Sequence, residues 1–200
     1  MDIALELYRE AQEIKKAVIG IDEVGRGAWA GPLVVAAVRL PKHYPELKDS
    51  KQLDPQKRAK LAVILREIAD FVIVEVNIEQ LNSENLHILN LSAMLEAGEQ
   101  LRVHAGNSET LTFCDGYAPT QHPSYIAIKG GDRLLPEIAA ASIIAKVHRD
   151  SIMINYCEKY PNYKFDQHKG YGTALHQQAL VKYGPCPIHR VRFKPIKKLL

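Results

Sequence analysis

Short, continuous apolar runs alternate along this 200-residue chain with longer segments in which apolar residues recur every three or four positions. Runs bounded by glycine, proline or polar turn residues are typical of buried strands. Five such runs predict strands at residues 17–21, 33–40, 71–76, 110–114 and 124–128. The second run, LVVAAVRL, is apolar except for Arg39, which predicts a strand buried on both faces.

The three-to-four-residue spacing predicts helices in the segments between these runs. Asp54 is a good N-cap, and Pro55 suits the first turn of a helix that continues to about residue 68. The other helices are expected over residues 3–14, 86–104, 138–160 and 173–183. Residues 77–85 and 161–172 are expected to be irregular.

This order of elements predicts an α/β fold with one five-stranded mixed sheet flanked by helices. The link between the first two strands is too short for a crossover helix, so these strands should form an antiparallel hairpin. Internal repeats and linkers are absent from the sequence. Residues 1–200 are therefore expected to form a single domain, with residues 161–200 as a helical and basic C-terminal appendage.

Composition narrows the class of protein. A hydrophobic fraction of 46% and a charged fraction of 24% are typical of a globular protein, and the net charge is +3. The basic segment 189–198 holds five Lys or Arg and no acid, which suits either a polyanion or a solvated tail. Three cysteines without CxxC spacing argue against a disulfide framework or a zinc site, and no apolar run is long enough to cross a bilayer. A cytoplasmic protein with no membrane partner is expected.

Candidate chemistry begins in the stretch IGIDEVGRGAWAGP, residues 19–32. Asp22 and Glu23 follow a buried run, and a buried charge needs a partner or a metal. Gly25 and Gly27 flank Arg26, so the backbone can approach a ligand closely while the guanidinium reaches an anion. The acids are suited to bind a metal, and the adjacent loop is suited to bind an anion. Together they indicate chemistry on a phosphate.

Two further acids, Asp115 and Asp132, follow the fourth and fifth predicted strands. If those strands run parallel to the first, all four acids meet at one edge of the sheet. Clustered carboxylates repel one another unless cations lie between them, and hard divalent ions take oxygen ligands. Two such ions suit in-line phosphoryl displacement. Taken singly, Asp115 before Gly116 also fits a turn and Asp132 a helix cap.

Seven motifs occur in order across about residues 18–193: DEVGRG, DSKQL, CDG, GGD, AAASIIAKVHRD, HKGYGT and GPCPIHR. Together they make the chain resemble bacterial ribonuclease HII, the type 2 ribonuclease H. The resemblance implies an RNase H-like fold and endonucleolytic cleavage of RNA in RNA–DNA hybrids. It also implies incision at single ribonucleotides embedded in duplex DNA, leaving 5′-phosphate and 3′-hydroxyl ends.

The resemblance assigns roles to individual residues. It makes Asp22, Glu23, Asp115 and Asp132 the metal-binding catalytic carboxylates, with two divalent ions per site, Mg²⁺ or Mn²⁺. It makes the loop of Gly25, Arg26 and Gly27 the part that senses the ribose, with Tyr171 beside it, and Ser50 and Lys51 a phosphate-contacting pair.

Other residues are less constrained. Lys146 and Arg149 lie three apart on one helix face and could hold phosphates or form structural ion pairs. Asp150 is expected in an ion pair. Ala28-Trp29 replaces the proline common after the glycine loop, and packing is expected for Trp29.

Other functions remain to be weighed. A ribonuclease HIII would carry an extra N-terminal domain, a Holliday-junction resolvase would cut all-DNA junctions, and a non-catalytic RNA-binding module would leave hybrid uncut. The expected partners are RNA–DNA hybrid and ribonucleotide-containing duplex DNA. A monomer is expected, and nothing in the sequence supports or excludes a sliding clamp as a partner.

Overall fold

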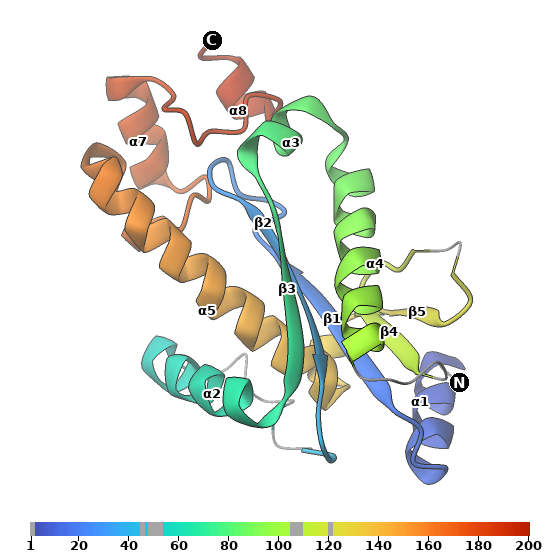
Figure 1. The fold of residues 1–200 in the computed structure, drawn as a ribbon. Helices are drawn as coiled ribbons and strands as arrows, with labels where there is room; N and C mark the ends of the chain where they lie inside the picture. The colour runs from blue at the N-terminus through green and yellow to red at the C-terminus, as the bar shows by residue number, and fades with distance from the viewer. Residues whose placement is uncertain (1–2, 45–46, 48–53, 105–109, 120–121) are drawn as a thin grey trace.

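Five strands form one mixed sheet in the computed structural model of the chain, which describes residues 3–44, 47, 54–104, 110–119 and 122–200 (Figure 1). The sheet order is β3-β2-β1-β4-β5. The strands are β1 (Val18–Val24), β2 (Leu33–Arg39), β3 (Asp70–Val76), β4 (Leu111–Asp115) and β5 (Tyr125–Ile128). All five correspond to runs predicted from the sequence.

The directions of the strands place the carboxyl ends of β1, β4 and β5 side by side. β1 and β2 pair antiparallel, which confirms the predicted hairpin, and β2 pairs antiparallel with β3. β1 pairs parallel with β4, and β4 pairs parallel with β5. The carboxyl ends of these three parallel strands therefore lie at one edge of the sheet, where open α/β sheets bind ligands.

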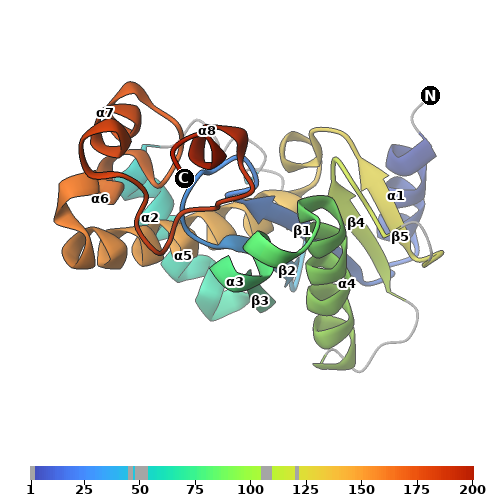
Figure 2. The same cartoon turned by 90° about the horizontal axis from the view of Figure 1, so that it is seen from above.

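Helices cover both faces of the sheet (Figures 1 and 2). α4 (Leu86–His104) packs on one face, where it meets Leu33, Val35 and Ala37 of β2. α5 (Pro136–Lys159) and α2 (Pro55–Ile68) pack on the other, where α5 meets the alternate residues of β2. Both faces of β2 are thus buried, as its apolar run predicts.

α5 lies close against β1 because Gly20 has no side chain. A Cβ atom at Gly20 would collide with the backbone of Glu137, one residue into α5. At the same end, α1 (Ile3–Glu13) packs through Tyr8 against Phe113 of β4. The close contact at Gly20 therefore brings the backbone of α5 directly against the backbone of β1.

The C-terminal segment packs on the far end of α5 (Figure 2). It contains η3 (Pro161–Tyr163), α6 (Phe165–His168), α7 (Ala174–Tyr183) and α8 (Lys194–Lys197). Two short helical turns therefore occupy the region 161–172, which the sequence predicts to be irregular. The basic segment is not simply solvated, because His189, Arg190 and Ile196 are buried while its four other Lys and Arg residues are exposed.

Residues 77–85 are also more ordered than predicted. α3 (Ile78–Ser83) occupies them and begins with a capping box, in which the Asn77 side chain accepts from the Gln80 backbone and the Gln80 side chain accepts from the Asn77 backbone. The prediction of an irregular segment is therefore wrong. Among the described residues, no helix is both long and apolar enough to span a membrane.

Candidate active site

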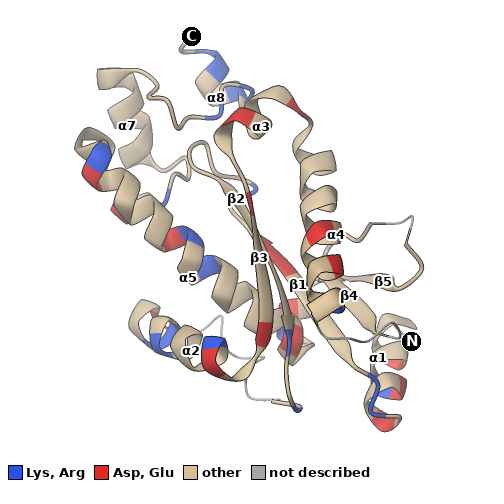
Figure 3. Ribbon diagram, viewed as in Figure 1, with Lys and Arg blue, Asp and Glu red and all other residues tan. Residues whose placement is uncertain are grey.

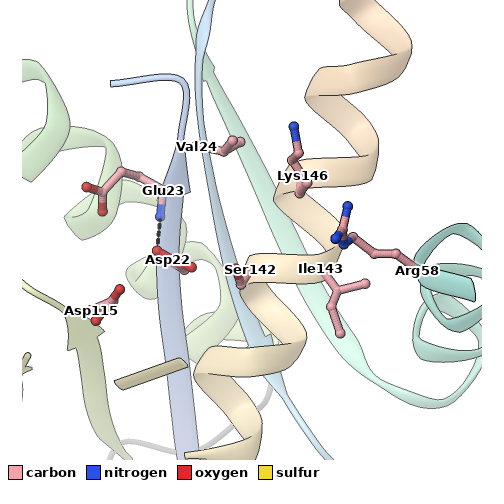
Figure 4. Close-up of a pocket in the computed structure, with 8 residues that line it drawn as sticks. All are labelled: Asp22, Glu23, Val24, Arg58, Asp115, Ser142, Ile143 and Lys146. Carbon is pink, nitrogen blue, oxygen red and sulfur yellow. Dashed lines mark hydrogen bonds between the residues drawn. The ribbon is translucent and has the colours of Figure 1, made fainter. Parts of the chain in front are cut away.

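Three of the four predicted acids line one pocket of about 340 Å³ (Figure 4). Asp22 and Glu23 come from β1, and Asp115 comes from β4. The facing wall is formed by α5 and α2, whose lining residues are Arg58, Ser142, Ile143 and Lys146. Acidic side chains thus face a wall that carries two basic ones, and Figure 3 shows acidic residues on β1 and both basic and acidic residues along α5.

Asp22 lies within β1 rather than beyond its end, because the pairing with β2 continues through Asp22, Glu23 and Val24. Its side chain is 6% exposed and accepts a hydrogen bond from the Glu23 backbone N–H at 2.8 Å. Burial, and next the negative charge of Asp115, raise the pKa of Asp22 to about 7, while Ser142 counteracts this shift. A nearby cation would favour the ionised form.

Glu23 is also held in a partly desolvated position. Burial raises its pKa, against the attraction of Arg26, whose guanidinium lies 3.8 Å from Glu23 Oε1. Glu23 Oε2 is buried and accepts no hydrogen bond from any described residue. A buried carboxylate oxygen without a donor is suited to a cation.

Asp115 and Asp132 are connected through the turn between β5 and α5. The turn forms η2 (Gly131–Arg133), and the Gly131 N–H donates to Asp115 Oδ1 at 2.8 Å. Asp132, the next residue, is 1% exposed but is not among the residues that line the pocket. Three of the four predicted acids therefore share the pocket, and the fourth, Asp132, is buried outside its lining, next in sequence to the residue that donates to Asp115.

The donor set fits hard divalent cations. Asp22, Glu23 and Asp115 offer oxygens from two adjacent strands, including the orphaned Oε2 of Glu23. Within the described residues, no three His, Cys, Asp or Glu side chains already form a metal-binding group. Mg²⁺ keeps several waters and is commonly bound through one or two carboxylates, so it does not require such a closed group.

The predicted glycine loop directly follows Asp22 and Glu23 in the sequence. Gly25 has a positive φ of 92°, and Ala28 N–H donates to its carbonyl to close a turn. Arg26 lies over the Tyr117 ring, 4.3 Å from its centroid, and its Nη2 lies 3.4 Å from Nδ1 of His87. Arg26 thus links the acid on β1 with an aromatic pair that the sequence prediction did not include.

Trp29 follows this loop in the sequence and contacts the segment that contains Tyr171. Gly170 O accepts from the Trp29 and Ala30 N–H groups, which ties residues 170–171 to the glycine loop. The Trp29 ring packs against Gly172 and lies 5.6 Å from the ring centroid of His176, so the expectation of packing for Trp29 is confirmed. Tyr171 is half-buried beside it.

The structure places the residues predicted to contact phosphate in three different settings. Lys146 lines the pocket and pairs with Asp150 at 2.7 Å, which confirms the ion pair expected for Asp150. Arg149 is fully buried and donates to backbone carbonyls, so the prediction that it holds a phosphate is wrong. Ser50 and Lys51 lie outside the described residues.

Two polar residues of the pocket, Ser142 and Arg58, were missed by the sequence prediction. Ser142 lies one helical turn before Lys146 on α5, and this spacing of four could have identified it. Arg58 lies in the first turns of α2, where a basic residue carries no distinguishing signal.

A five-stranded sheet of this order, with acids at the carboxyl ends of β1 and β4, defines an RNase H-like nuclease. The chain belongs to the ribonuclease HII family, whose sequence model matches residues 19–196. It is 44% identical over 187 residues to ribonuclease HII of Dichelobacter nodosus, covering 92% of this chain and 97% of that one. The family acts as a metal-dependent endonuclease on the RNA of RNA–DNA hybrids.

Solved structures agree with this assignment. The ribonuclease H2 of Pyrococcus horikoshii OT3 is similar with a TM-score of 0.75 and 26% identity, covering 92% of this chain and 96% of that one. The RNase HII of Archaeoglobus fulgidus, solved in complex with PCNA, gives a TM-score of 0.72 and 25% identity, covering 89% and 95%.

Proposed function

We propose that this member of the ribonuclease HII family incises duplex DNA at embedded single ribonucleotides, in addition to cleaving the RNA strand of hybrids. The products would carry 5′-phosphate and 3′-hydroxyl ends. The observation that carries the proposal is the continuity of residues 22–27. The loop suited to testing a ribose follows Asp22 and Glu23 without a break, so a sugar bound by the loop lies beside the acids.

In this proposal Asp22, Glu23, Asp115 and Asp132 hold two divalent ions, Mg²⁺ or Mn²⁺. Bound ions would activate a water and stabilise the leaving oxygen of an in-line displacement. The protein's own contribution is to supply these acids from three backbone segments, β1, β4 and η2. The hydrogen bond from Gly131 to Asp115 fixes the turn relative to β4.

The glycine loop would recognise the ribose through its backbone. Among the described residues, no acceptor is found for the backbone N–H groups of Gly25, Arg26 and Gly27. Only a ribonucleotide offers a 2′-hydroxyl, which these groups can test by hydrogen bonding. Tyr171, beside the loop, would pack against the neighbouring sugar and favour a deoxyribose there.

Basic residues would hold the nucleic-acid backbone. Lys146 and Arg58 face the acids across the pocket (Figure 4). Lys51 and Ser50 are proposed to contact phosphate as well. The exposed cations Arg192, Lys194, Lys197 and Lys198 give the C-terminal segment a surface for a polyanion.

We further propose that the chain is one domain that works as a monomer in the cytoplasm, in DNA replication and in the repair of misincorporated ribonucleotides. The three described cysteines are free, as expected in a reducing compartment.

A substrate panel tests the proposal. Four duplexes of one sequence are incubated with the protein and Mg²⁺: a full RNA–DNA hybrid, a DNA duplex with one ribonucleotide, an all-DNA duplex and double-stranded RNA. We expect cleavage of the first two only, with the single-ribonucleotide duplex cut at one position. Cleavage of the hybrid alone would contradict incision at embedded ribonucleotides.

A further inference from the structure

Two arginines are buried beneath the glycine loop. Arg149 comes from α5 and Arg190 from the segment before α8, and both side chains are 0% exposed. Within the part of the chain that the structure describes, neither guanidinium forms an ion pair with a carboxylate. A buried charge is costly unless its donors are satisfied, so their hydrogen bonds identify what these residues do.

Arg190 binds the carbonyl groups of the loop from below. Its Nε and Nη2 donate to Gly31 O at 2.9 and 2.8 Å, and its Nη1 donates to Arg26 O at 3.2 Å. Its backbone N–H donates to Trp29 O at 2.8 Å. One residue near the C-terminus therefore fixes three carbonyls between residues 26 and 31.

Arg149 binds two further carbonyls, those of Ala30 and Pro32, and also reaches the carbonyl of Lys169. Its Nη2 donates to Ala30 O at 3.0 Å, and its Nε donates to Pro32 O at 2.8 Å. Its Nη1 donates to Lys169 O at 2.9 Å, and its guanidinium lies 5.4 Å from the centroid of the Tyr171 ring. Arg149 thus connects the glycine loop to Tyr171.

The glycines of the loop are shaped around Arg149. A Cβ atom at Gly25 would collide with the Nε and Cδ atoms of Arg149. A Cβ atom at Gly31 would collide with Met153 and lie 3.3 Å from Nη2 of Arg149. Both glycines also have positive φ angles. The loop therefore rests directly on this side chain.

The carbonyl groups of the loop and its N–H groups differ in whether the protein binds them. The carbonyls of Arg26, Trp29, Ala30 and Gly31 accept hydrogen bonds from the two arginines, which fixes how that side of the loop is oriented. The N–H groups of residues 25–27 keep no acceptor among the described residues. Groups held in place before binding cost less entropy when a ligand arrives.

We propose that Arg149 and Arg190 are positioning residues that preset the amides of residues 25–27, and through Arg149 also Tyr171, for reading a ribonucleotide. This inference rests on the proposed function of the loop. It assigns specificity for ribose to a pair of side chains that do not touch the nucleic acid.

Kinetics with a competitor test the role. The variants Arg149→Lys and Arg190→Lys keep the charge but lose the fork of donors. The matched control is Arg102→Lys, a half-buried arginine on α4 that donates to Thr112 and lies far from the loop in sequence. The KM for a DNA duplex with one ribonucleotide is measured, together with the inhibition constant of the all-DNA duplex.

We expect KM to rise about tenfold in both loop variants, because one well-placed hydrogen bond corresponds to about that factor. The inhibition constant of the all-DNA duplex should change by less than about twofold, and the control variant should match the parent protein. A lower kcat with unchanged KM would show only a smaller folded fraction and would overturn the proposal. An equal rise in both constants would also overturn it, because the arginines would then serve general phosphate attraction.

Hydrogen exchange provides a readout that does not depend on activity. In the free protein, peptides covering residues 24–32 should exchange faster in Arg149→Lys and Arg190→Lys, while peptides covering β2 remain unchanged. Unchanged exchange in the loop, or faster exchange throughout the molecule, would contradict a positioning role. If the parent protein fails to cut the single-ribonucleotide duplex, the proposed function fails, and this exchange measurement still decides whether the arginines order the loop.

Discussion

The backbone N–H of Gly131 donates a hydrogen bond to the Asp115 carboxylate at 2.8 Å. This contact joins the end of β4 to the turn that follows β5, two segments separated by 15 residues of chain. Asp132 is the residue after Gly131, while Asp22 and Glu23 lie in the same pocket as Asp115 and come from the neighbouring strand β1. The acidic site is therefore assembled from three backbone segments, and its acids are expected to act as a unit.

Substituting one of these acids tests whether the carboxylates act together in cleavage. Asp22→Asn keeps the size of the side chain and removes a charge at the centre of the pocket. We expect cleavage to fall by on the order of 10³-fold, because several kcal/mol of charge stabilisation would be lost. Hybrid binding should persist. Asp70→Asn, which alters an exposed acid paired with Arg39, is the control. Substantial turnover by Asp22→Asn would refute the proposed metal-binding role.

Tyr171 should affect embedded ribonucleotides more than long hybrids. In Tyr171→Ala the ring that contacts Arg149 is lost, and with it the proposed packing against a neighbouring sugar. We expect the rate of incision at a single ribonucleotide to fall about tenfold, and Tyr171→Phe to retain most of it. Initial rates on the single-ribonucleotide duplex measure the effect. An unchanged rate in Tyr171→Ala would remove this residue from the site.

Lys146 should contribute through its charge. Lys146→Met removes a cation from the rim of the pocket while keeping the length of the side chain. We expect weaker hybrid binding at all sequences, and a salt dependence of log Kd that is shallower by about one unit of slope. Lys60→Met, on an exposed face of α2, is the matched control. An unaltered slope would show that the ion pair with Asp150 is the main role of Lys146.

Buried histidines predict how stability depends on pH. Burial lowers the pKa of both His176 and His189 to about 4, and their Nε2 atoms lie 3.0 Å apart. The unfolded chain binds protons on these residues below about pH 6.5, whereas the folded protein binds them only below about pH 4. Their stability contribution is therefore complete above pH 6.5 and is lost as the pH falls towards 4.

Urea denaturation at pH 7 and at pH 4.5 measures this effect. We expect a loss on the order of 2 kcal/mol per histidine across that interval. The double variant His176→Gln, His189→Gln should lose less stability over the same interval than the parent protein does. His104→Gln, an exposed substitution on α4, serves as the control. An equal loss in the double variant and the parent would contradict the assignment.

The sheet and the acids could be predicted because their signals are local. The apolar runs that become β2 and β4 are bounded by breaking residues, and Asp115 directly follows the apolar residues of its strand. The parallel direction of β1, β4 and β5 then places the acids at one edge. The capping box of Asn77 and Gln80 was equally local, and it could have identified α3 from the sequence.

The supporting residues could not be predicted in this way. Arg149 and Arg190 look like surface cations in the sequence, since arginine is rarely buried. The carbonyl groups that they bind in residues 26–32 lie 117 to 164 positions earlier in the sequence. No local pattern therefore reveals these contacts. Burial of a charged side chain becomes visible only when the C-terminal segment is packed against the glycine loop.

In the proposed function, the carboxylates on β1, β4 and the η2 turn hold divalent ions where a nucleic-acid strand is cut. Anomalous diffraction from crystals of the protein soaked in Mn²⁺, with a bound duplex that carries a non-cleavable ribonucleotide linkage, tests this most directly. We expect two Mn²⁺ peaks bounded by Asp22, Glu23, Asp115 and Asp132, next to the scissile phosphate. Peaks located elsewhere, or no peak between these acids while the duplex is bound, would contradict it.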